Sequence, residues 1–472
     1  MKPNVIIVTF DCLRPDHLGF AGYKGVETPT FDRLAEESLV FENAYCQGPN
    51  TWISHASMFT GCLPAVHGVR TPLRKIRAEV PTMAEVLKGQ GYATFALPGT
   101  TLLSPAAGFD RGFDRYDLSD LQGRGGGLDS CYYRGAENAL AKIDTLLHSA
   151  KPPFFLWIHY FGIHTLGSEL LDLPPRYSRA YSEYAEHYDG KVSYADQAFL
   201  ASLVELLTSR GLLDRTLLVL WSDHGEDLAK VGPAGWSSGH NVGLEEEVVR
   251  ILLMMRIPGG GVRGRRGEVV SSTDIAPTVY EICGLSHNGN VQGVSRVEAG
   301  TEAADGAAYF ENLCQGFLGL RAGPWKLVLG STAELRGEVE RAGAGRLRLA
   351  EKLAWRWAVL RDAFATVLRR TSKPRLVRAH GHRVPAEWWR KRKEPEEVAA
   401  EALKTGAARL WQWQQGGPCL IEHAEEQCGE TVALLRSKLA KLSLPGDVDA
   451  SANISEEEQE RLRDDLSALG YM

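Results

Sequence analysis

Acidic side chains follow two apolar runs of the sequence, each at the point where a buried strand would end. Asp11 comes directly after the run Val5–Phe10, and Asp223 and His224 come directly after the run Thr216–Ser222. In open α/β sheets, ligands bind at the edge where the carboxyl ends of the strands meet. Carboxylate oxygens and an imidazole nitrogen suit a divalent cation. The pattern therefore predicts a metal site, although each of these side chains alone is commonly a cap or a hydrogen-bonded polar group.

Thr51 is the hydroxyl that such a cation could activate. It lies in GPNTWISHASMFTG, residues 48–61, just ahead of an expected helix start at residues 54–57. A bound divalent cation can lower the pKa of a coordinated oxygen by many units, which would make a poor nucleophile reactive near neutral pH. The N-terminus of the helix would stabilise charge on a transferred phosphoryl or sulfuryl group. A helix cap is the alternative for Thr51.

Three histidines extend the same pattern. His159 lies late in the apolar run FFLWIHY, His164 follows five residues later, and His240 lies 17 residues after Asp223 in SSGHNVG. Imidazoles near the carboxyl edge of a sheet suit contact with an anionic ester and protonation of a leaving group. A structural histidine is the alternative, above all for His159, whereas the loop positions of His164 and His240 favour function.

The elements that position these residues follow from the hydrophobic pattern. Short apolar runs alternate with helical patterns through the first 290 residues, which is typical of an α/β sheet with helices on both faces. We expect strands at Val5–Phe10, Tyr92–Leu97, Phe154–Tyr160, Thr216–Ser222 and Arg250–Ile257, and helices at Thr82–Gln90, Gly135–Ser149, Tyr184–Ser209 and Thr273–Cys283.

Two glycine-rich stretches, residues 122–130 and 258–268, are expected to be loops. Neither has the strand–turn–helix setting that a phosphate-binding glycine loop requires, so no ligand is assigned to them.

Composition indicates a globular protein. The 472 residues are 44% hydrophobic and 24% charged, with a net charge of −6, and no window reaches the roughly 18 consecutive apolar residues of a membrane span. The N-terminal apolar run is too short for a secretory signal. The eight cysteines are scattered without a C-x-x-C pair, which favours free thiols in a reducing cytoplasm.

The C-terminal third differs in character. Residues 341–393 hold 16 Lys or Arg against three acids, a net charge of +13, so the rest of the chain carries −19. Four tryptophans lie in this segment. Solvated helices that bury their tryptophans against the main body are one interpretation, and a contact with an anionic surface or polymer is the other. We expect a catalytic domain at residues 1–300 and a smaller α+β subdomain at residues 301–472.

The order of these motifs resembles the sulfatase family of the alkaline phosphatase superfamily. The resemblance reaches from residue 4 to about residue 285, with a weaker echo at residues 318–330. It implies a large mixed sheet sandwiched by helices, with a smaller C-terminal subdomain. The motifs that carry it are NVIIVTFDCLRPDHLGFAGYKGVETPTFDRLAEESLVFENAY, TWISHASMFTGCLPAVHGV, GFDRGFDRY, FLWIHYFGIHT, VLWSDHGEDL, GHNVGLEEEVVRILLMM and SSTDIAPTVYEICGL.

The resemblance implies roles for residues that match its motifs. Thr51 takes the place of the nucleophile and of a further metal ligand, and Cys12 takes a place that is usually a second ligand Asp. His164 and His240 match positions that contact substrate, and His240 stands where many sulfatases have Lys. We include His159 and His55 among the substrate-binding residues. Asp11, Asp223 and His224 match the metal ligands.

Departures from the family pattern bear on the chemistry. Sulfatases carry Cys or Ser in a C/S-x-P-x-R motif that is converted to formylglycine, whereas here the aligned residues are TWISH, with His55 in the place of the Arg. Cys62 has the C-x-P spacing but lies after the motif and is rejected as the nucleophile. The strand at residues 92–97 is followed by LPGTTLLS, without the Lys and His that sulfatases keep. A Thr nucleophile is similar to the phosphodiesterases and phosphotransferases of the superfamily.

We therefore expect a metal-dependent hydrolase or transferase of phosphate monoesters or diesters that uses Thr51. One divalent cation per chain, Zn, Mn, Mg or Ca, and an anionic ester substrate follow, with a soluble acceptor if the enzyme is a transferase. The alternatives are a sulfatase that dispenses with formylglycine and an inactive binding protein of the same fold. Nucleic-acid binding through residues 341–393 is the weakest hypothesis.

Overall fold

The structure is a computed structural model that describes most of the first 330 residues and parts of the remainder. The described residues are 2–71, 74–119, 121, 135–164, 184–228, 240, 243–286, 291–298, 306–313, 316–330, 399–400, 402–404, 407–414, 417–421 and 429–443.

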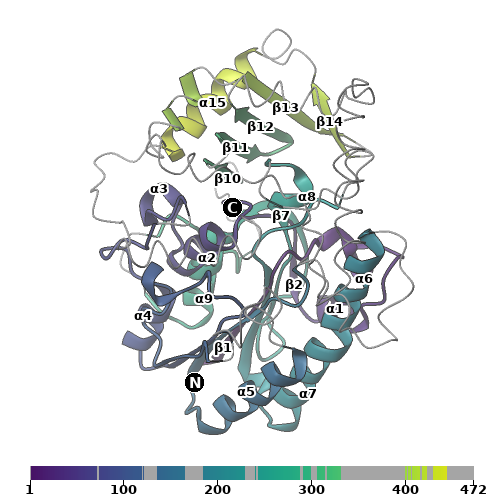
Figure 1. Ribbon diagram of the computed structural model, residues 1–472, viewed down its shortest axis with the longest axis vertical. Coiled ribbons are helices and arrows are strands. Elements are labelled where there is room, and N and C mark those ends of the chain that lie inside the picture. The colour runs from purple at the N-terminus through teal and green to yellow at the C-terminus, as the bar shows by residue number, and fades with distance from the viewer. Residues whose placement is uncertain are drawn as a thin grey trace, which may run out of the picture.

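A large mixed β-sheet forms the centre of the molecule (Figure 1). Its strands β1, β3, β5 and β6 run parallel to one another, and β8 joins β6 in the antiparallel direction. The described strands lie in the order β4 (Arg115–Tyr116), β3 (Ala93–Leu97), β5 (Phe154–Tyr160), β1 (Asn4–Phe10), β6 (Thr216–Ser222), β8 (Leu253–Arg256), β2 (Leu39–Tyr45) and β7 (Arg250–Ile251), with β9 (Gly264–Ser271) paired to β2.

Helices cover both faces of this sheet, because alternate residues of its strands bury opposite faces. On β1, Val5 and Ile7 pack into one apolar core with residues of α2, α4 and α9, while Ile6 and Val8 pack into a second core with residues of α5, α6 and α7. The helices are α1 (Pro29–Glu36), α2 (Thr51–Thr60), α3 (Pro64–His67), α4 (Met83–Gly89), α5 (Ala136–Ser149), α6 (Tyr184–Tyr194), α7 (Ala201–Ser209), α8 (Glu246–Val249) and α9 (Ile275–Ile282).

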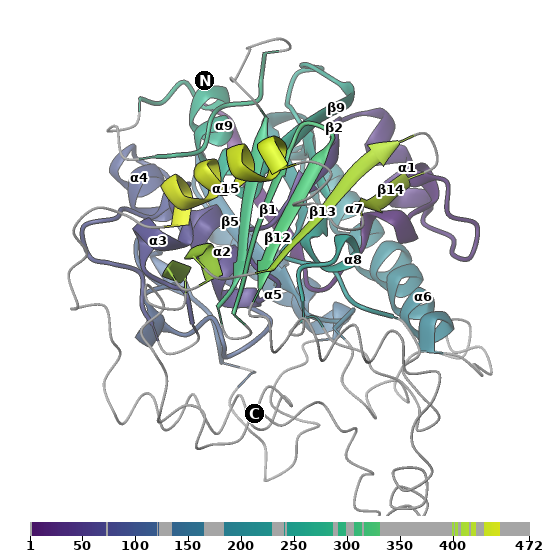
Figure 2. The ribbon, with the colours of Figure 1, turned by 90° about the horizontal axis from the view of Figure 1, so that it is seen from above.

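A smaller antiparallel sheet packs beside the large one, at the top of Figure 1. Helix α15 (Gly429–Ser443) contacts β11 and β12 and lies across this sheet in the view from above (Figure 2). The predicted fold class, a mixed sheet sandwiched by helices with a smaller α+β part, is therefore confirmed. The strands of the smaller sheet, in order, are β10 (Ala307–Asn312), β11 (Phe317–Ala322), β12 (Trp325–Gly330), β13 (Ala407–Gln414) and β14 (Gly417–Ile421).

Four of the predicted strands form within one residue of their expected ends, but the fifth was wrong in one respect. The run Arg250–Ile257 divides into β7 and β8 at Leu252. There the N–H of Leu252 donates to Oγ of Ser222 at 2.8 Å, and the Leu252 carbonyl accepts from the Ser222 N–H at 3.1 Å. A serine side chain thus takes the place of one ladder bond, which interrupts the strand.

Strands β2 and β9 were absent from the prediction, and residues 264–268 were wrongly expected to be loop. β9 pairs in parallel with β2, with Leu39 opposite Gly264 and Tyr45 opposite Ser271. The first five residues of β9 are exposed or partly exposed, so its sequence lacks the apolar run that marks a strand. Pairing with a partner more than 200 residues away decides the conformation.

The predicted helix Tyr184–Ser209 is continuous but contains a π-helical segment, Ala195–Leu200, between α6 and α7. Inside it, the buried Asp196 carboxylate accepts the backbone N–H groups of Thr30 at 3.1 Å and Phe31 at 2.7 Å. These are the first-turn donors of α1, which would otherwise lack partners. A local widening of one helix thus accompanies the capping of another.

Several expectations lie outside the described residues: the loop at 122–130, the boundary near residue 300 and the basic segment 341–393. Among the described helices, none combines the length and the apolar character needed to cross a membrane. Four cysteines are buried free thiols, in agreement with the prediction: Cys12, Cys46, Cys62 and Cys283.

A buried ion pair joins the large-sheet part of the chain to β10. Arg70 donates to Glu311 through two bonds of 2.9 and 2.6 Å, and both side chains are at most 1% exposed. We expect Arg70→Met to lower the free energy of unfolding by about 3–5 kcal/mol, because it leaves the Glu311 carboxylate buried without its cation. Urea unfolding measures this. The double variant Arg70→Met, Glu311→Gln should recover part of the lost free energy of unfolding, because no unpaired carboxylate remains. A double variant no more stable than Arg70→Met alone would contradict the coupling between Arg70 and Glu311.

Asp196 should make stability depend on pH. Burial raises its pKa to about 6, above the ordinary value of 3.8, so the native state binds the proton more tightly than the unfolded state. The contribution of Asp196 to the free energy of unfolding therefore grows as the pH falls through about 6, and it is complete below pH 3.8. Relative to Asp196→Asn, the wild type should gain about 1 kcal/mol between about pH 7.5 and pH 5 in urea unfolding. A difference between the two proteins that does not change with pH would refute this.

Candidate active site and metal centre

Parallel pairing of β1 and β6 brings the two predicted acidic positions together. Phe10 pairs with Ser222, so the residues that follow, Asp11 and Asp223, leave the sheet at the same edge. Both carboxylates are completely buried. Cys12 bridges them: its N–H donates to Asp223 Oδ1 at 3.3 Å, and its thiol donates to Asp11 Oδ1 at 3.1 Å. The strand-end prediction thus placed both acids in one site.

Thr51 is the first residue of α2, not a residue ahead of the helix as expected. Asn50 takes the cap position, so the cap alternative for Thr51 was wrong. Thr51 Oγ1 instead lies 3.5 Å from Asp11 Oδ2 and 3.3 Å from His224 Nε2, with no exposed surface. A hydroxyl that faces a carboxylate and an imidazole at a helix N-terminus has the surroundings that a nucleophile needs.

The loop before α2 is held by the smaller sheet. The N–H of Glu311, in β10, donates to the carbonyl of Gln47 at 2.9 Å, and the Gln47 amide donates to Ser271 Oγ at 2.6 Å. Ser54 Oγ donates to the carbonyl of Gly48 at 2.9 Å. A Cβ at Gly48 would lie 2.9 Å from the Glu311 carbonyl oxygen, so this position needs glycine. β10 therefore helps to set the position of Thr51.

The orientation of His224 fits metal binding. Its Nδ1 lies 2.9 Å from the carbonyl of Gly225, which assigns the proton to Nδ1 and leaves the Nε2 lone pair facing Thr51 and Asp223. Asp223 Oδ2 accepts no hydrogen bond from any described residue. An unsatisfied carboxylate oxygen, a second buried carboxylate and an imidazole with an inward lone pair fit a divalent cation held by Asp11, Asp223, His224 and Thr51.

The electrostatics of the site also favour a bound cation. Burial raises the pKa of Asp11 although His224 opposes this effect, which shows how poorly the charged carboxylate is solvated. Burial would lower the pKa of His224, but Asp223 and Asp11 outweigh it and raise the pKa. A cation bound among these groups would offset the cost of burying two carboxylates together.

His159 and His55 lie behind the predicted ligands. Gly99 N–H donates to His159 Nδ1 at 3.2 Å, so the Nε2 proton faces Asp11 Oδ2 at 3.0 Å. His55 Nδ1 donates to the carbonyl of Thr51 at 2.7 Å, and its ring lies 5.0 Å from the ring of His159. Burial lowers the pKa of His55 to about 3 and that of His159 to about 4. The geometry favours positioning by two neutral imidazoles, and their contact with substrate stays a prediction.

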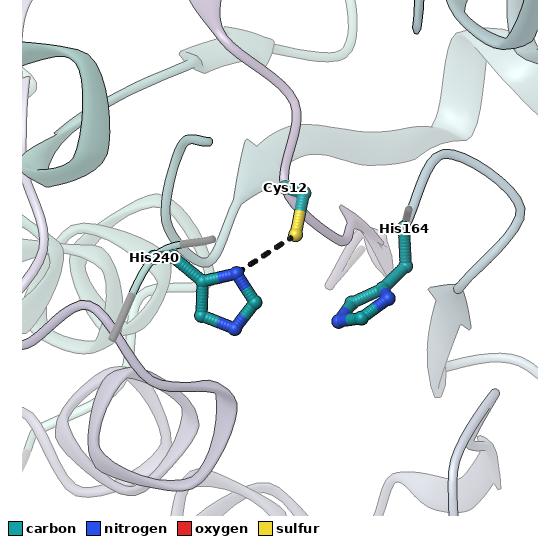
Figure 3. A group of neighbouring side chains, drawn as sticks. All are labelled: Cys12, His164 and His240. Atoms are coloured by element: carbon teal, nitrogen blue, oxygen red, sulfur yellow. Dashed lines mark hydrogen bonds between the residues drawn. The ribbon is translucent and has the colours of Figure 1, made fainter. Parts of the chain in front are cut away.

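Cys12, His164 and His240 form a second group of side chains in the site (Figure 3). Cys12 Sγ lies 3.6 Å from His240 Nδ1 and 3.8 Å from His224 Nδ1. Burial raises the pKa of the Cys12 thiol well above its ordinary value, an effect that Asp11 increases, so the thiol is neutral unless a cation binds. His164 and His240, predicted from loops far apart in the sequence, thus lie beside the acidic cluster.

Two buried charged residues of the site were missed. Glu226 Oε2 lies 3.3 Å from His240 Nδ1, and Lys191 Nζ donates to the carbonyl of His164 at 2.8 Å. Glu226 is the third acidic or basic group of SDHGE, which was a signal in the sequence that the analysis did not use. Lys191 lies in the middle of a long helix, where no local pattern distinguishes it from a solvated lysine.

Comparison with known proteins identifies the family of the chain. The sequence profile described as Sulfatase matches residues 3–285. The chain belongs to the sulfatase family. It is 26% identical to arylsulfatase A of Homo sapiens over 327 residues, which cover 60% of this chain and 64% of that protein. It is 23% identical to a sulfatase of Formosa agariphila, covering 60% and 70%. The chain thus spans just under two thirds of the first of these relatives.

Solved structures share the fold of this sulfatase-family chain. The phosphonate monoester hydrolase of Agrobacterium radiobacter superposes with a TM-score of 0.55 and 17% identity, over 78% of this chain and 95% of that one. A 2-O GAG sulfatase superposes with a TM-score of 0.54 and 16% identity, over 78% and 93%. The family profile ends at residue 285 and therefore does not cover the smaller sheet, which begins with β10.

Removal of divalent cations should destabilise the protein, because it leaves Asp11 and Asp223 buried without a counter-charge. At a free cation concentration ~100 times Kd, the bound ion contributes about 2.7 kcal/mol. Thermal unfolding with EDTA and after replenishment with Mn²⁺, Zn²⁺ or Ca²⁺ measures the shift in Tm. We expect Asp223→Asn to abolish the shift on replenishment with Ca²⁺, which binds oxygen ligands, and Asp117→Asn, directly after the edge strand β4, to retain it. An equal shift in Asp223→Asn would place the cation elsewhere.

Proposed function

We propose that this chain hydrolyses esters of a tetrahedral oxyanion, a sulfate ester or a phosphate or phosphonate monoester, with Thr51 as the nucleophile. The observation that carries the proposal is the position of Thr51 Oγ1 at the start of α2, 3.3 Å from His224 Nε2 and 3.5 Å from Asp11 Oδ2. Membership of the sulfatase family supports the same reaction class.

Different residues of the chain have different roles in such a reaction. Asp11, Asp223 and His224 would hold the divalent cation, which when bound lowers the pKa of a coordinated hydroxyl and offsets negative charge on the ester. Thr51 Oγ1 attacks sulfur or phosphorus, its proton passing to the adjacent carboxylate of Asp11. The first N–H groups and the dipole of α2 face the oxygens that gain negative charge.

Bond changes occur in two steps. The bond between Thr51 Oγ1 and sulfur or phosphorus forms as the bond to the leaving-group oxygen breaks, and that oxygen takes a proton. His164 and His240 lie beside the first ligand group, with the His240 ring 4.1 Å from that of His224, and are the candidates for this donation. Water then cleaves the Thr51 ester and releases the oxyanion, which restores the hydroxyl.

The nature of the central atom is where the two candidate substrates differ. The phosphate-ester preference expected from the sequence is not favoured by the two sequence relatives reported above, since both are sulfatases. Sulfate esters are therefore supported at least as well. Phosphorus esters stay the second candidate because Thr51 lacks the hydrate by which formylglycine expels sulfate. Transfer to an acceptor alcohol would use the same Thr51 intermediate and is a further hypothesis.

Loss of catalysis with retention of the fold is the competing hypothesis. It would account for Cys12 at an acidic position of the family motif and for His55 in the place of an Arg. Against it, Thr51 Oγ1 lies 3.5 Å from Asp11 Oδ2 and 3.3 Å from His224 Nε2. A site without turnover has no chemical need for that arrangement.

Replacement of Thr51 tests the proposal. With aryl sulfate, aryl phosphate and aryl phosphonate esters, we expect Thr51→Ala to lower kcat by roughly 10³-fold or more, because no attacking atom remains. Thr51→Ser should keep a measurable rate. Thr60→Ala is the matched control: Thr60 is a buried threonine of the same helix whose hydroxyl donates to the Ala56 carbonyl at 2.7 Å.

Intact-protein mass spectrometry identifies the intermediate in the same samples. A sulfate or phosphate adduct on Thr51, absent from Thr51→Ala and present in Thr60→Ala, is expected on rapid quenching. The class of ester that yields the adduct shows whether the enzyme acts on sulfur or on phosphorus. Equal turnover by wild type and Thr51→Ala would refute Thr51 as the nucleophile, and cation binding without turnover of any ester would favour the binding protein.

A further inference from the structure

A second group of metal-ligating side chains lies beside the Asp11 site. Cys12, His164 and His240 are each at most 4% exposed, and their ligand atoms all lie within 4.8 Å of one another. In Figure 3 the two imidazoles approach the thiol from opposite sides. The three residues come from the end of β1 and from two separate loops, so this cluster is a product of tertiary packing.

The donor chemistry of this cluster differs from that of the first site. Asp11, Thr51 and Asp223 supply hard oxygen donors, whereas Cys12, His164 and His240 supply one sulfur and two nitrogens. A thiolate with two imidazoles is a zinc ligand set, and three protein ligands with an open fourth position are typical of catalytic zinc. We propose that Cys12, His164 and His240 form a second cation site, selective for zinc, next to the oxygen-rich site.

Distances in the cluster are compatible with this assignment. A tetrahedral zinc with Zn–S of about 2.3 Å and Zn–N of about 2.0 Å sets its sulfur and nitrogen ligands roughly 3.5 Å apart. Cys12 Sγ and His240 Nδ1 lie 3.6 Å apart. The ligand atom of His164 lies within 4.8 Å of those of Cys12 and His240. Glu226 Oε2 lies 3.3 Å from the same His240 nitrogen, so binding of zinc to that nitrogen would replace this contact and leave the Glu226 carboxylate next to the cation.

The backbone at Cys12 provides an independent sign of function. Its φ is 61°, and it is the non-glycine residue with positive φ among those that the structure describes. A left-handed non-glycine residue costs of order 1–3 kcal/mol and persists where surrounding contacts impose it. Tyr188 Oη donates to the Cys12 carbonyl at 2.6 Å, and the Cys12 N–H donates to Asp223 Oδ1. These contacts hold Cys12 at the junction of the two ligand groups.

The two imidazoles are also held in place. The His164 ring stacks on Phe161 with centroids 4.4 Å apart, and Lys191 donates to the His164 carbonyl at 2.8 Å. The His240 ring lies 4.1 Å from that of His224. Such support limits the reorganisation that binding a cation requires. When the cation binds, Cys12 loses its proton to solvent, and its sulfur forms the bond to the metal.

This second site goes beyond the proposed reaction and does not depend on it. It replaces the expectation of one cation per chain with two cations of different ligand chemistry. It also changes how His164 and His240 would meet a substrate, since an ester oxygen would contact the cation in the open fourth position rather than the imidazoles themselves.

Cobalt substitution tests the second site without any ester. Apoprotein is titrated with Co²⁺, and both the cation content and the near-ultraviolet absorption of a cobalt–thiolate bond are measured. We expect two ions per wild-type chain with a thiolate band, and one ion without the band in Cys12→Ser. Asp223→Asn should keep the band while losing the other ion. Cys283→Ser, a buried free thiol elsewhere, is the matched control and should behave as wild type.

His240→Gln provides a second variant in case Cys12→Ser does not fold. We expect it to weaken the site that gives the thiolate band by ~10-fold or more and to leave the other ion bound. A wild type with one ion and no thiolate band would overturn the proposal, as would a band that persists unchanged in both variants. Because the titration contains no ester, its outcome does not depend on whether Thr51 is the nucleophile.

Discussion

Two carboxylates buried at neighbouring strand ends impose the constraint on which the rest of the site depends. Asp11 and Asp223 follow β1 and β6, have no exposed surface, and are joined through the backbone and thiol of Cys12. Two such charges are costly in a low-dielectric interior unless a cation or hydrogen-bond donors compensate them. The inward lone pair of His224 and the hydroxyl of Thr51 are arranged around this need.

The smaller sheet has a part in the site although its strands follow the segment that the family profile matches. β10 donates a backbone hydrogen bond to the loop that precedes α2 and carries Glu311, the buried partner of Arg70. Because Gly48 approaches the Glu311 carbonyl closely, a shift of β10 would move the start of α2. The position of the proposed nucleophile is thus shared between two sheets.

A layered arrangement of imidazoles surrounds the acidic pair. His159 and His55 contact Asp11 and the Thr51 carbonyl from behind, where burial keeps them neutral. His164 and His240 form a second layer with Cys12, and the His240 ring lies 4.1 Å from that of His224. The neutral imidazoles of His55 and His159 fix the orientations of Thr51 and Asp11. The layer of Cys12, His164 and His240 remains available for a cation or an ester.

Much of the central fold followed from the sequence, because fully buried strands such as β1 and β6 have apolar runs that end at a polar residue. β2 and β9 did not, since Glu42 in β2 is exposed and the first half of β9 is charged. The π-helical segment contains Asp196, whose carboxylate accepts two backbone hydrogen bonds from α1, and no local pattern indicates this contact.

For the site, the sequence by itself determined the residue types and the strand ends that carry them: Asp11, Asp223 and His224 were placed because parallel strands share one edge. Only the tertiary structure decided that Thr51 begins a helix and that Glu226 belongs to the site. It alone placed His240 beside Cys12, 228 residues earlier. The physical reason is that periodicity reports burial over a few neighbouring residues, whereas ligand geometry depends on packing between segments far apart in the chain.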